Sequence, residues 1–225
     1  MKPGRNHLKG VGLAVILVSA LGMQSAMASP GTIVGSKHDF SASGYSGTNN
    51  TNAQVCIYCH APHNNLSAAG ALLWNRAAST ATYIAYSSPS MNGAPTATSM
   101  GPTSKVCLSC HDGAIAVDSY GTFTGATKAS GAVKIGPDLS NDHPIGFTYD
   151  AALVTLDPGL KAITSNALIG NQTSGTIDTK MLFGGKVECA SCHDVHNSLA
   201  GTAVQDKLLR ITSAASAICR TCHIK

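Results

Sequence analysis

The residues most able to do chemistry are the eight cysteines, all of which fall in four copies of one motif. Each copy reads Cys-x-x-Cys-His. Two thiols three residues apart can form thioethers with two vinyl groups on one porphyrin edge, and the following histidine can bind the iron. The spacing therefore predicts four covalently bound haem c groups. The predicted attachment residues are Cys56, Cys59, Cys107, Cys110, Cys189, Cys192, Cys219 and Cys222, and the motif histidines are His60, His111, His193 and His223.

The remaining histidines match the remaining iron positions. The chain has nine histidines, and His7 lies in the N-terminal segment that we expect to be removed. Four irons have eight axial positions, so we expect two imidazoles on each iron. Such iron is low-spin and has a lower potential than iron with a histidine–methionine pair. The predicted ligands outside the motifs are His38, His63, His143 and His196.

The position of His63 constrains how the ligands pair. It follows His60 by three residues and cannot reach round the porphyrin to the other face of the same iron. The sequence predicts pairing within each half of the chain: His63 with His111, His38 with His60, His196 with His223, and His143 with His193. We also expect His38, on a Gly/Ser/Asn-rich arm, to be able to ligate an iron of an adjacent copy of the chain.

The motifs reveal an internal duplication. Residues 56–66 and 189–199 both read C-x-x-C-H-x-x-H-N-x-L, and each is followed by a plain Cys-x-x-Cys-His. Downstream of these segments, Leu72-Leu73 resembles Leu208-Leu209. The repeat predicts two tandem di-haem modules, 29–133 and 134–225, forming one tetrahaem domain. Asp112, Asp194 and Asn64 are candidates to orient the imidazoles.

The N-terminus predicts export. Lys2, Arg5 and Lys9 precede an apolar run, and Ala26-Met27-Ala28 resembles a signal-peptidase site, so we expect residues 1–28 to be removed. The predicted location is extracellular or at the outer-membrane surface, with the periplasm as the alternative. No transmembrane segment is expected. The chain has no basic cluster, which argues against a nucleic-acid partner.

Composition predicts an irregular fold. Only 5% of residues are aromatic and 12% are charged, so the haems are expected to form much of the core. The expected fold class is a multihaem cytochrome c that is mostly loop, with a few short helices and little strand. We predict short helices around the motifs and at 203–210 and 212–222, a strand within 114–123, and a loop over 77–103.

The four motifs, the two CxxCHxxHN segments and the HDF and NDHPIGF stretches resemble extracellular multihaem c-type cytochromes of metal-reducing bacteria. This resemblance implies few regular elements, bis-histidine irons and polymerisation into electron-conducting filaments. It also implies copies of the chain itself, other multihaem cytochromes and extracellular electron acceptors as partners.

Two other functions are compatible with parts of the pattern. A multihaem reductase, or its monomeric electron donor, would share the motifs. A catalytic haem usually keeps an open or unusually ligated iron, however, and the histidine count leaves none, so we do not expect an enzyme. Paired Cys-x-x-Cys motifs also build zinc sites, but four adjacent histidines and the export signal favour haem.

Overall fold

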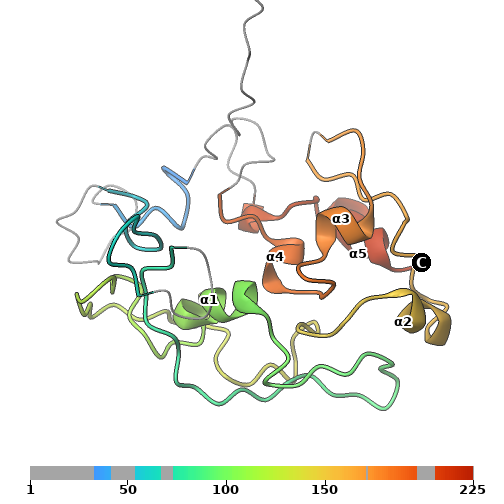
Figure 1. Ribbon diagram of the computed structural model, residues 1–225, viewed down its shortest axis with the longest axis horizontal. Helices are drawn as coiled ribbons and strands as arrows, with labels where there is room; N and C mark the ends of the chain where they lie inside the picture. Colours follow the sequence, from blue (N-terminus) through green and yellow to red (C-terminus); the bar gives the residue numbers. More distant parts are fainter. Residues whose placement is uncertain (1–32, 42–53, 67–72, 171, 197–205, 225) are drawn as a thin grey trace, which may run out of the picture.

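The computed structural model describes residues 33–41, 54–66, 73–170, 172–196 and 206–224, and most of this backbone is loop (Figure 1). β-structure in these ranges is limited to isolated bridges. None of the helices described there is long and apolar enough to cross a membrane. The helices are α1 (Pro102–His111), α2 (Ala151–Leu156), α3 (Ile177–Met181), α4 (Cys189–Cys192) and α5 (Ala217–Cys222), with 3-10 turns η2 (Gly131–Val133), η3 (Asp206–Leu208) and η4 (Ala214–Ser216).

Short helices coincide with three of the four motifs, as the sequence predicts. The longest of them, α1, starts with Pro102 in its first turn and ends at His111. Proline suits this position because the first amides of a helix have no intrahelical acceptor. Helix α5 and η4 together cover 214–222 of the helix predicted at 212–222. The first motif forms a turn instead of a helix.

Two helices outside the motifs were not predicted from the sequence. Helix α2 begins after Asp150, whose carboxylate accepts a hydrogen bond from the Leu153 amide at 2.8 Å. Helix α3 begins with a capping box in which Thr176 and Thr179 exchange hydrogen bonds between side chain and backbone. Both helices are short, so the end caps supply much of their local stabilisation.

Two sequence predictions are wrong. Residues 114–123 form no strand; the bridge between Tyr120 and Phe123 closes a tight turn. The helix predicted at 203–210 lies partly outside the described residues. In the described part, Lys207 and Leu208 have φ angles of 54° and 53°, which a right-handed helix cannot contain. The loop predicted at 77–103 is confirmed up to the start of α1.

A small apolar core lies in the C-terminal half, where the sequence suggested that large side chains were too few. It contains residues from 147 to 187, and Ala167, Ile169 and Ile177 are fully buried there. Two smaller clusters surround Tyr58 and Leu108. The segment between His143 and the third motif therefore packs largely through its own side chains.

The two predicted modules touch directly. Helix α1 lies between residues 33–41 and 54–66 on one side and α3, α4 and α5 on the other (Figure 1). It contacts α4, and the Gly101 amide donates to a Glu188 carboxylate oxygen at 2.7 Å. Lys186 also donates from Nζ to the Ser99 carbonyl at 2.7 Å. The second and third motifs are thus held side by side.

Candidate haem-binding site

Each motif presents its three functional groups on one turn of backbone. At the first, third and fourth motifs, the histidine amide donates to the carbonyl of the first cysteine, at 2.8, 3.1 and 3.0 Å. At the second motif the same residues lie within α1. Positions i, i+3 and i+4 of such a turn share one face. The two thiols and the imidazole of each motif therefore lie together, as attachment to one planar group requires.

At three of the motifs, two backbone hydrogen bonds join the motif to another segment of the chain, which we call the strap. At the first motif, Asn75 donates its amide to the Cys59 carbonyl at 2.8 Å, and Ala61 donates to Leu73 at 3.0 Å. The equivalent bonds are Arg210 to Cys192 (2.9 Å) and Asp194 to Leu208 (2.8 Å) at the third motif, and Lys161 to Cys222 and Ile224 to Gly159 (both 2.8 Å) at the fourth.

The strap at the first and third motifs changes the alignment of the two segments after them. Leu73 and Leu208 occupy equivalent places and both have positive φ, 55° and 53°. The sequence comparison had matched Leu73 with Leu209. The structural match moves this correspondence by one residue, because the connecting loops differ in length.

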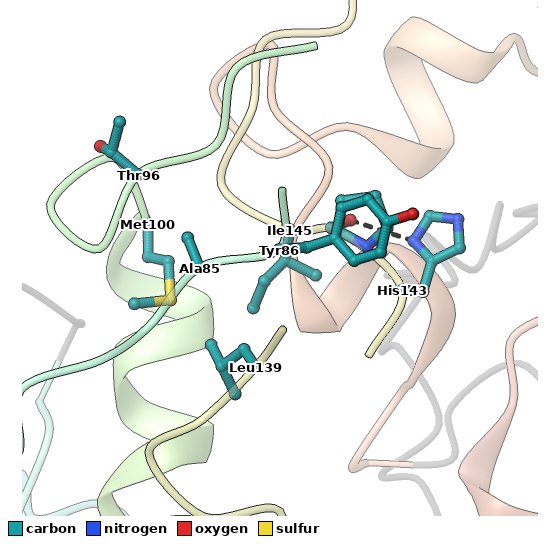
Figure 2. A pocket seen from close by; sticks show the side chains of 8 residues that line it. Ala85, Tyr86, Thr96, Met100, Leu139, His143 and Ile145 are labelled. Atoms are coloured by element: carbon teal, nitrogen blue, oxygen red, sulfur yellow. Dashed lines mark hydrogen bonds between the residues drawn. The ribbon is translucent and has the colours of Figure 1, made fainter. Parts of the chain in front are cut away.

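Backbone carbonyls fix the orientation of several imidazoles. Nδ1 of His111 lies 2.8 Å from the Val133 carbonyl oxygen, and Nδ1 of His193 lies 2.8 Å from that of Lys207. His143 makes the same contact with Pro144 at 3.0 Å (Figure 2). A carbonyl can only accept, so Nδ1 carries the proton and Nε2 keeps its lone pair for a metal.

The residues expected to orient the imidazoles have other roles. Asp112 accepts hydrogen bonds from the Ser79 hydroxyl and from Tyr83, the latter at 2.8 Å. Asp194 accepts from the His196 amide at 3.1 Å. Backbone carbonyls orient the imidazoles because the straps and η2 place the main chain next to the rings. Sequence spacing does not reveal this proximity.

Six of the eight candidate ligands form three ring pairs. The ring centroids are 5.9 Å apart for His38 and His111, 6.1 Å for His60 and His196, and 6.3 Å for His143 and His223. Each pair joins one motif histidine to one histidine outside a motif.

These separations fit one metal ion between two imidazoles. Two rings on opposite faces of an iron have centroids about 6 Å apart, since each metal–nitrogen bond is about 2 Å and each centroid lies about 1 Å beyond its nitrogen. Rotation about the shared axis is free, so interplanar angles of 47°, 19° and 74° are all compatible. Among the described residues, the buried Nδ1 of His38 has no hydrogen-bond partner, so no hydrogen bond there fixes which ring nitrogen would face a metal.

The observed pairs differ from those predicted. His38 pairs with His111 instead of His60, and His143 pairs with His223 instead of His193. His196 crosses to the first module and stacks on His60. The prediction assumed that pairing stays local. The contacts between α1 and α4 instead bring the two halves together.

His38 lies against His111 of its own chain, and its predicted ligation of an iron in an adjacent copy stays a prediction. Burial, with smaller effects from His111 and His193, lowers the pKa of His38 to about 4. This imidazole is therefore neutral at physiological pH, as a metal ligand must be.

His63 and His193 are the two candidate ligands outside these pairs. Both side chains are exposed, and neither ring contacts another ring among the described residues. His193 has Nδ1 bonded to Lys207 and so keeps Nε2 free. In the repeated segments, His63 corresponds to His196 and His193 corresponds to His60.

Several partly buried thiols lie close to those of other motifs, whereas Cys56 and Cys219 are exposed. Burial raises the pKa of Cys59 to about 12 and that of Cys222 to about 11. The Cys107 thiol hydrogen-bonds to Cys189, which raises the pKa of Cys107. Buried neutral thiols of this kind suit the apolar edge of a porphyrin. Within the described ranges, no three His, Cys, Asp or Glu side chains converge as they would at a zinc site.

Aromatic side chains line the motifs as expected from the sequence. Trp74 is buried and packs edge-on against His60, with ring centroids 5.8 Å apart. Tyr58 is also buried, between Phe40 and Tyr120. No protein-family model matches the chain, and no curated protein matches it either.

Proposed function

We propose that the chain is an electron-transferring tetrahaem c-type cytochrome with two histidines on every iron. The observation that carries this proposal is the set of three ring pairs at 5.9–6.3 Å, each joining a motif histidine to a histidine outside a motif. His60 and His38 also contact other rings, Trp74 at 5.8 Å and Phe40 at 6.1 Å between centroids. The support therefore comes from the pairing of a motif histidine with a histidine outside a motif, at a separation that two ligands of one iron would have.

Different residues bind the porphyrins and the irons. The eight motif cysteines attach the porphyrins, and the motif histidines and their partners hold the irons. When bound, each haem iron supplies a one-electron ferric–ferrous couple. The hydrogen bonds from His111 and His193 to backbone carbonyls keep these rings in one tautomer and orientation. Rigid ligands favour fast electron transfer because little rearranges when the iron charge changes. No enzymatic activity is assigned.

A fourth pair, His63 with His193, supports assembly of the chain with copies of itself. His63 and His193 are both exposed, and neither ring contacts another ring in the part of the chain that the structure describes. His63 of one copy meeting His193 of the next makes a head-to-tail contact. A head-to-tail contact whose rotation does not close gives a filament. We therefore assign the bridging role, predicted for His38, to His63, and propose a filament that passes electrons to external acceptors.

Carbon monoxide binding across a dilution series tests whether His63 ligates an iron of an adjacent copy. Dissociated chains are expected to bind one carbon monoxide each, at the third-motif iron, whereas assembled chains bind none, because only an open iron binds this ligand. His63→Ala is expected to bind one carbon monoxide at every concentration and to form no filaments. His38→Ala serves as the control: it opens the second-motif iron but still assembles. Full ligation in a proven monomer would instead place His63 and His193 on one iron of the same chain.

A visible spectrum tests the proposed function itself. Dithionite reduction of the exported protein is expected to give a sharp band near roughly 550 nm, typical of low-spin haem c. The matched control is a chain with all eight cysteines changed to serine, which is expected to be colourless after unfolding and extraction with acidified solvent. A colourless native protein, or pigment that extracts fully without covalent attachment, contradicts the proposal.

A further inference from the structure

We propose that Glu188 is a positioning residue that holds the second and third motifs together, so that electrons pass between the two modules at this junction. This inference rests on the proposed function and adds to it the residue that joins the modules. Glu188 is the only glutamate of the chain, directly precedes the third motif and is 1% exposed. Both of its carboxylate oxygens bind α1, the helix that carries the second motif.

The Glu188 carboxylate acts as the missing cap of α1. The N-cap residue of this helix, Gly101, has no side chain that could accept a hydrogen bond from the first turn. Oε1 of Glu188 accepts from the Gly101 amide at 2.7 Å, and Oε2 accepts from the hydroxyl of Ser104, which is fully buried in that turn. A carboxylate at a helix N-terminus binds free donors and is stabilised by the positive end of the helix dipole. A residue of one module therefore fixes the start of a helix in the other.

Ser104 also binds the third motif. Its oxygen accepts from the Cys189 amide at 3.0 Å, which leaves its own proton for Glu188. The Glu188 amide donates to the Ser191 hydroxyl at 2.9 Å, so this segment is also bonded to α4. Relative sliding of α1 and α4 would break these hydrogen bonds.

The close approach of Glu188 favours glycine at position 101. A Cβ atom there would lie 2.8 Å from Oε1 and 3.2 Å from Cδ of Glu188, closer than such atoms pack. Gly101 has a φ angle of −79°, which any residue can adopt, so the contact and not the backbone conformation disfavours a side chain. Gly101→Ala therefore disturbs the junction from the side opposite to Glu188.

The junction places one cysteine of each motif next to the other. Cys107 follows Ser104 by three residues and shares its face of α1, and Ser104 bonds the Cys189 amide. The Cys107 thiol accordingly contacts that of Cys189. In a thioether to haem c, a single carbon atom separates the sulfur from the porphyrin ring. Sulfur atoms held next to one another therefore bring two porphyrin edges close together, and electron transfer requires such proximity because its rate falls steeply with distance.

The hydrogen bond between the two thiols is lost when both form thioethers, whereas the bonds of Glu188 remain. Glu188 is therefore the group that keeps the two attachment edges together in the haem-loaded protein. Its test has to report on haem geometry and not on stability alone.

Circular dichroism of the intact tetrahaem protein in the Soret region reports on this geometry. Haems held close together in a fixed orientation give a two-signed exciton couplet. We expect Glu188→Ala and Gly101→Ala each to abolish the contribution of the second and third haems to this couplet. Electron exchange between these two haems, followed by NMR line broadening in half-reduced protein, should be lost at the same time.

Removing individual haems assigns the change to one pair. The effect of Glu188→Ala on the couplet should vanish when the second haem is removed by Cys107→Ser with Cys110→Ser. It should persist when the first haem is removed by Cys56→Ser with Cys59→Ser. This comparison is a double-mutant cycle, which isolates the interaction between two sites.

Two further variants separate positioning from charge and from general stability. Glu188→Gln keeps an acceptor for the Gly101 amide and an amide that can donate to Ser104, so it should retain the couplet. Asp150→Ala is the matched control: Asp150 caps α2, which contains no motif, by accepting from the Leu153 amide at 2.8 Å. Its loss should lower stability and leave the couplet unchanged.

A couplet unchanged in Glu188→Ala and Gly101→Ala overturns the proposal, as does an effect that persists after the second haem is removed. Equal losses in Glu188→Gln and Glu188→Ala also overturn it, and so does electron exchange that continues without the couplet. A wild type that binds no haem refutes the proposed function instead. Two variants on opposite sides of the contact keep the test decisive if one fails to fold.

Discussion

Replacing His196 with alanine will open the iron of the first motif and leave that of the fourth motif closed. His196 lies 6.1 Å from His60 between ring centroids, whereas the fourth-motif histidine, His223, pairs with His143. Assembled His196→Ala protein should therefore bind one carbon monoxide per chain, against none for the assembled wild type. The spectrum of the affected iron should change from low-spin to high-spin, because one strong-field imidazole is lost.

Removing individual haems identifies the iron that opens. Adding Cys56→Ser and Cys59→Ser to His196→Ala should abolish carbon monoxide binding, since the iron that lost its ligand is no longer present. Adding Cys219→Ser and Cys222→Ser should leave binding at one per chain. The reverse result would show that His196 serves the fourth motif, as pairing within modules requires. His143→Ala is the matched variant, and it should show the opposite dependence.

Replacing Arg76 with methionine will lower the free energy of unfolding by about 1–3 kcal/mol, as expected when buried carbonyls lose their hydrogen-bond donor. The side chain is 2% exposed, and its guanidinium donates to the carbonyls of Ala116, Val117 and Ser119. Methionine fills similar volume but leaves these carbonyls without their donor. Chemical denaturation of both proteins, followed by circular dichroism, measures the difference.

Arg220→Met is the matched control for Arg76→Met. Arg220 is exposed, and the hydrogen bond recorded for this residue involves its backbone carbonyl. Its replacement should change the free energy of unfolding by less than about 0.5 kcal/mol, as is usual for surface positions. Equal effects of the two substitutions would show that Arg76 does not stabilise the loop at 116–119. Lysine at position 76 should restore little, because it lacks the planar fork that reaches several carbonyls.

The local chemistry of the motifs could be predicted from the sequence, because it depends on spacing alone. A cysteine at i and i+3 and a histidine at i+4 share a face on any helical turn, and the second, third and fourth motifs form such turns within α1, α4 and α5. The duplication was also readable, since it rests on repeated letters. The backbone bonds that join Asn75 to Cys59 and Arg210 to Cys192 recur at the fourth motif between Lys161 and Cys222, so they follow the motif and not the duplication.

The partners of the histidines could not be predicted, because they depend on contacts between the two halves. His196 reaches His60 only because the modules pack together, and Glu188 contributes by bonding to Gly101 and Ser104 in α1. No periodicity or motif signals such a contact. The carbonyls of Val133 and Lys207 that orient two imidazoles are equally invisible in sequence, since any residue type supplies a carbonyl.

The sequence does contain a signal for α2 and α3, namely their N-cap residues. Asp150 before α2 and Thr176 before α3 are typical N-cap residues, and Pro158 lies just beyond the end of α2. The apolar residues between them were too few to show helical periodicity. Their burial around Ile169 and Ile177 follows from the loops that fold over them. A low aromatic content therefore did not exclude a conventional core in this segment.

The intact mass of the exported protein, measured together with a titration of free thiols, tests the central claim most directly. Four haems attached through the eight motif cysteines predict a polypeptide mass increased by four haem groups and no reactive thiol, even after unfolding. A mass equal to the polypeptide alone, with thiols titrating or zinc bound to them, would contradict the account.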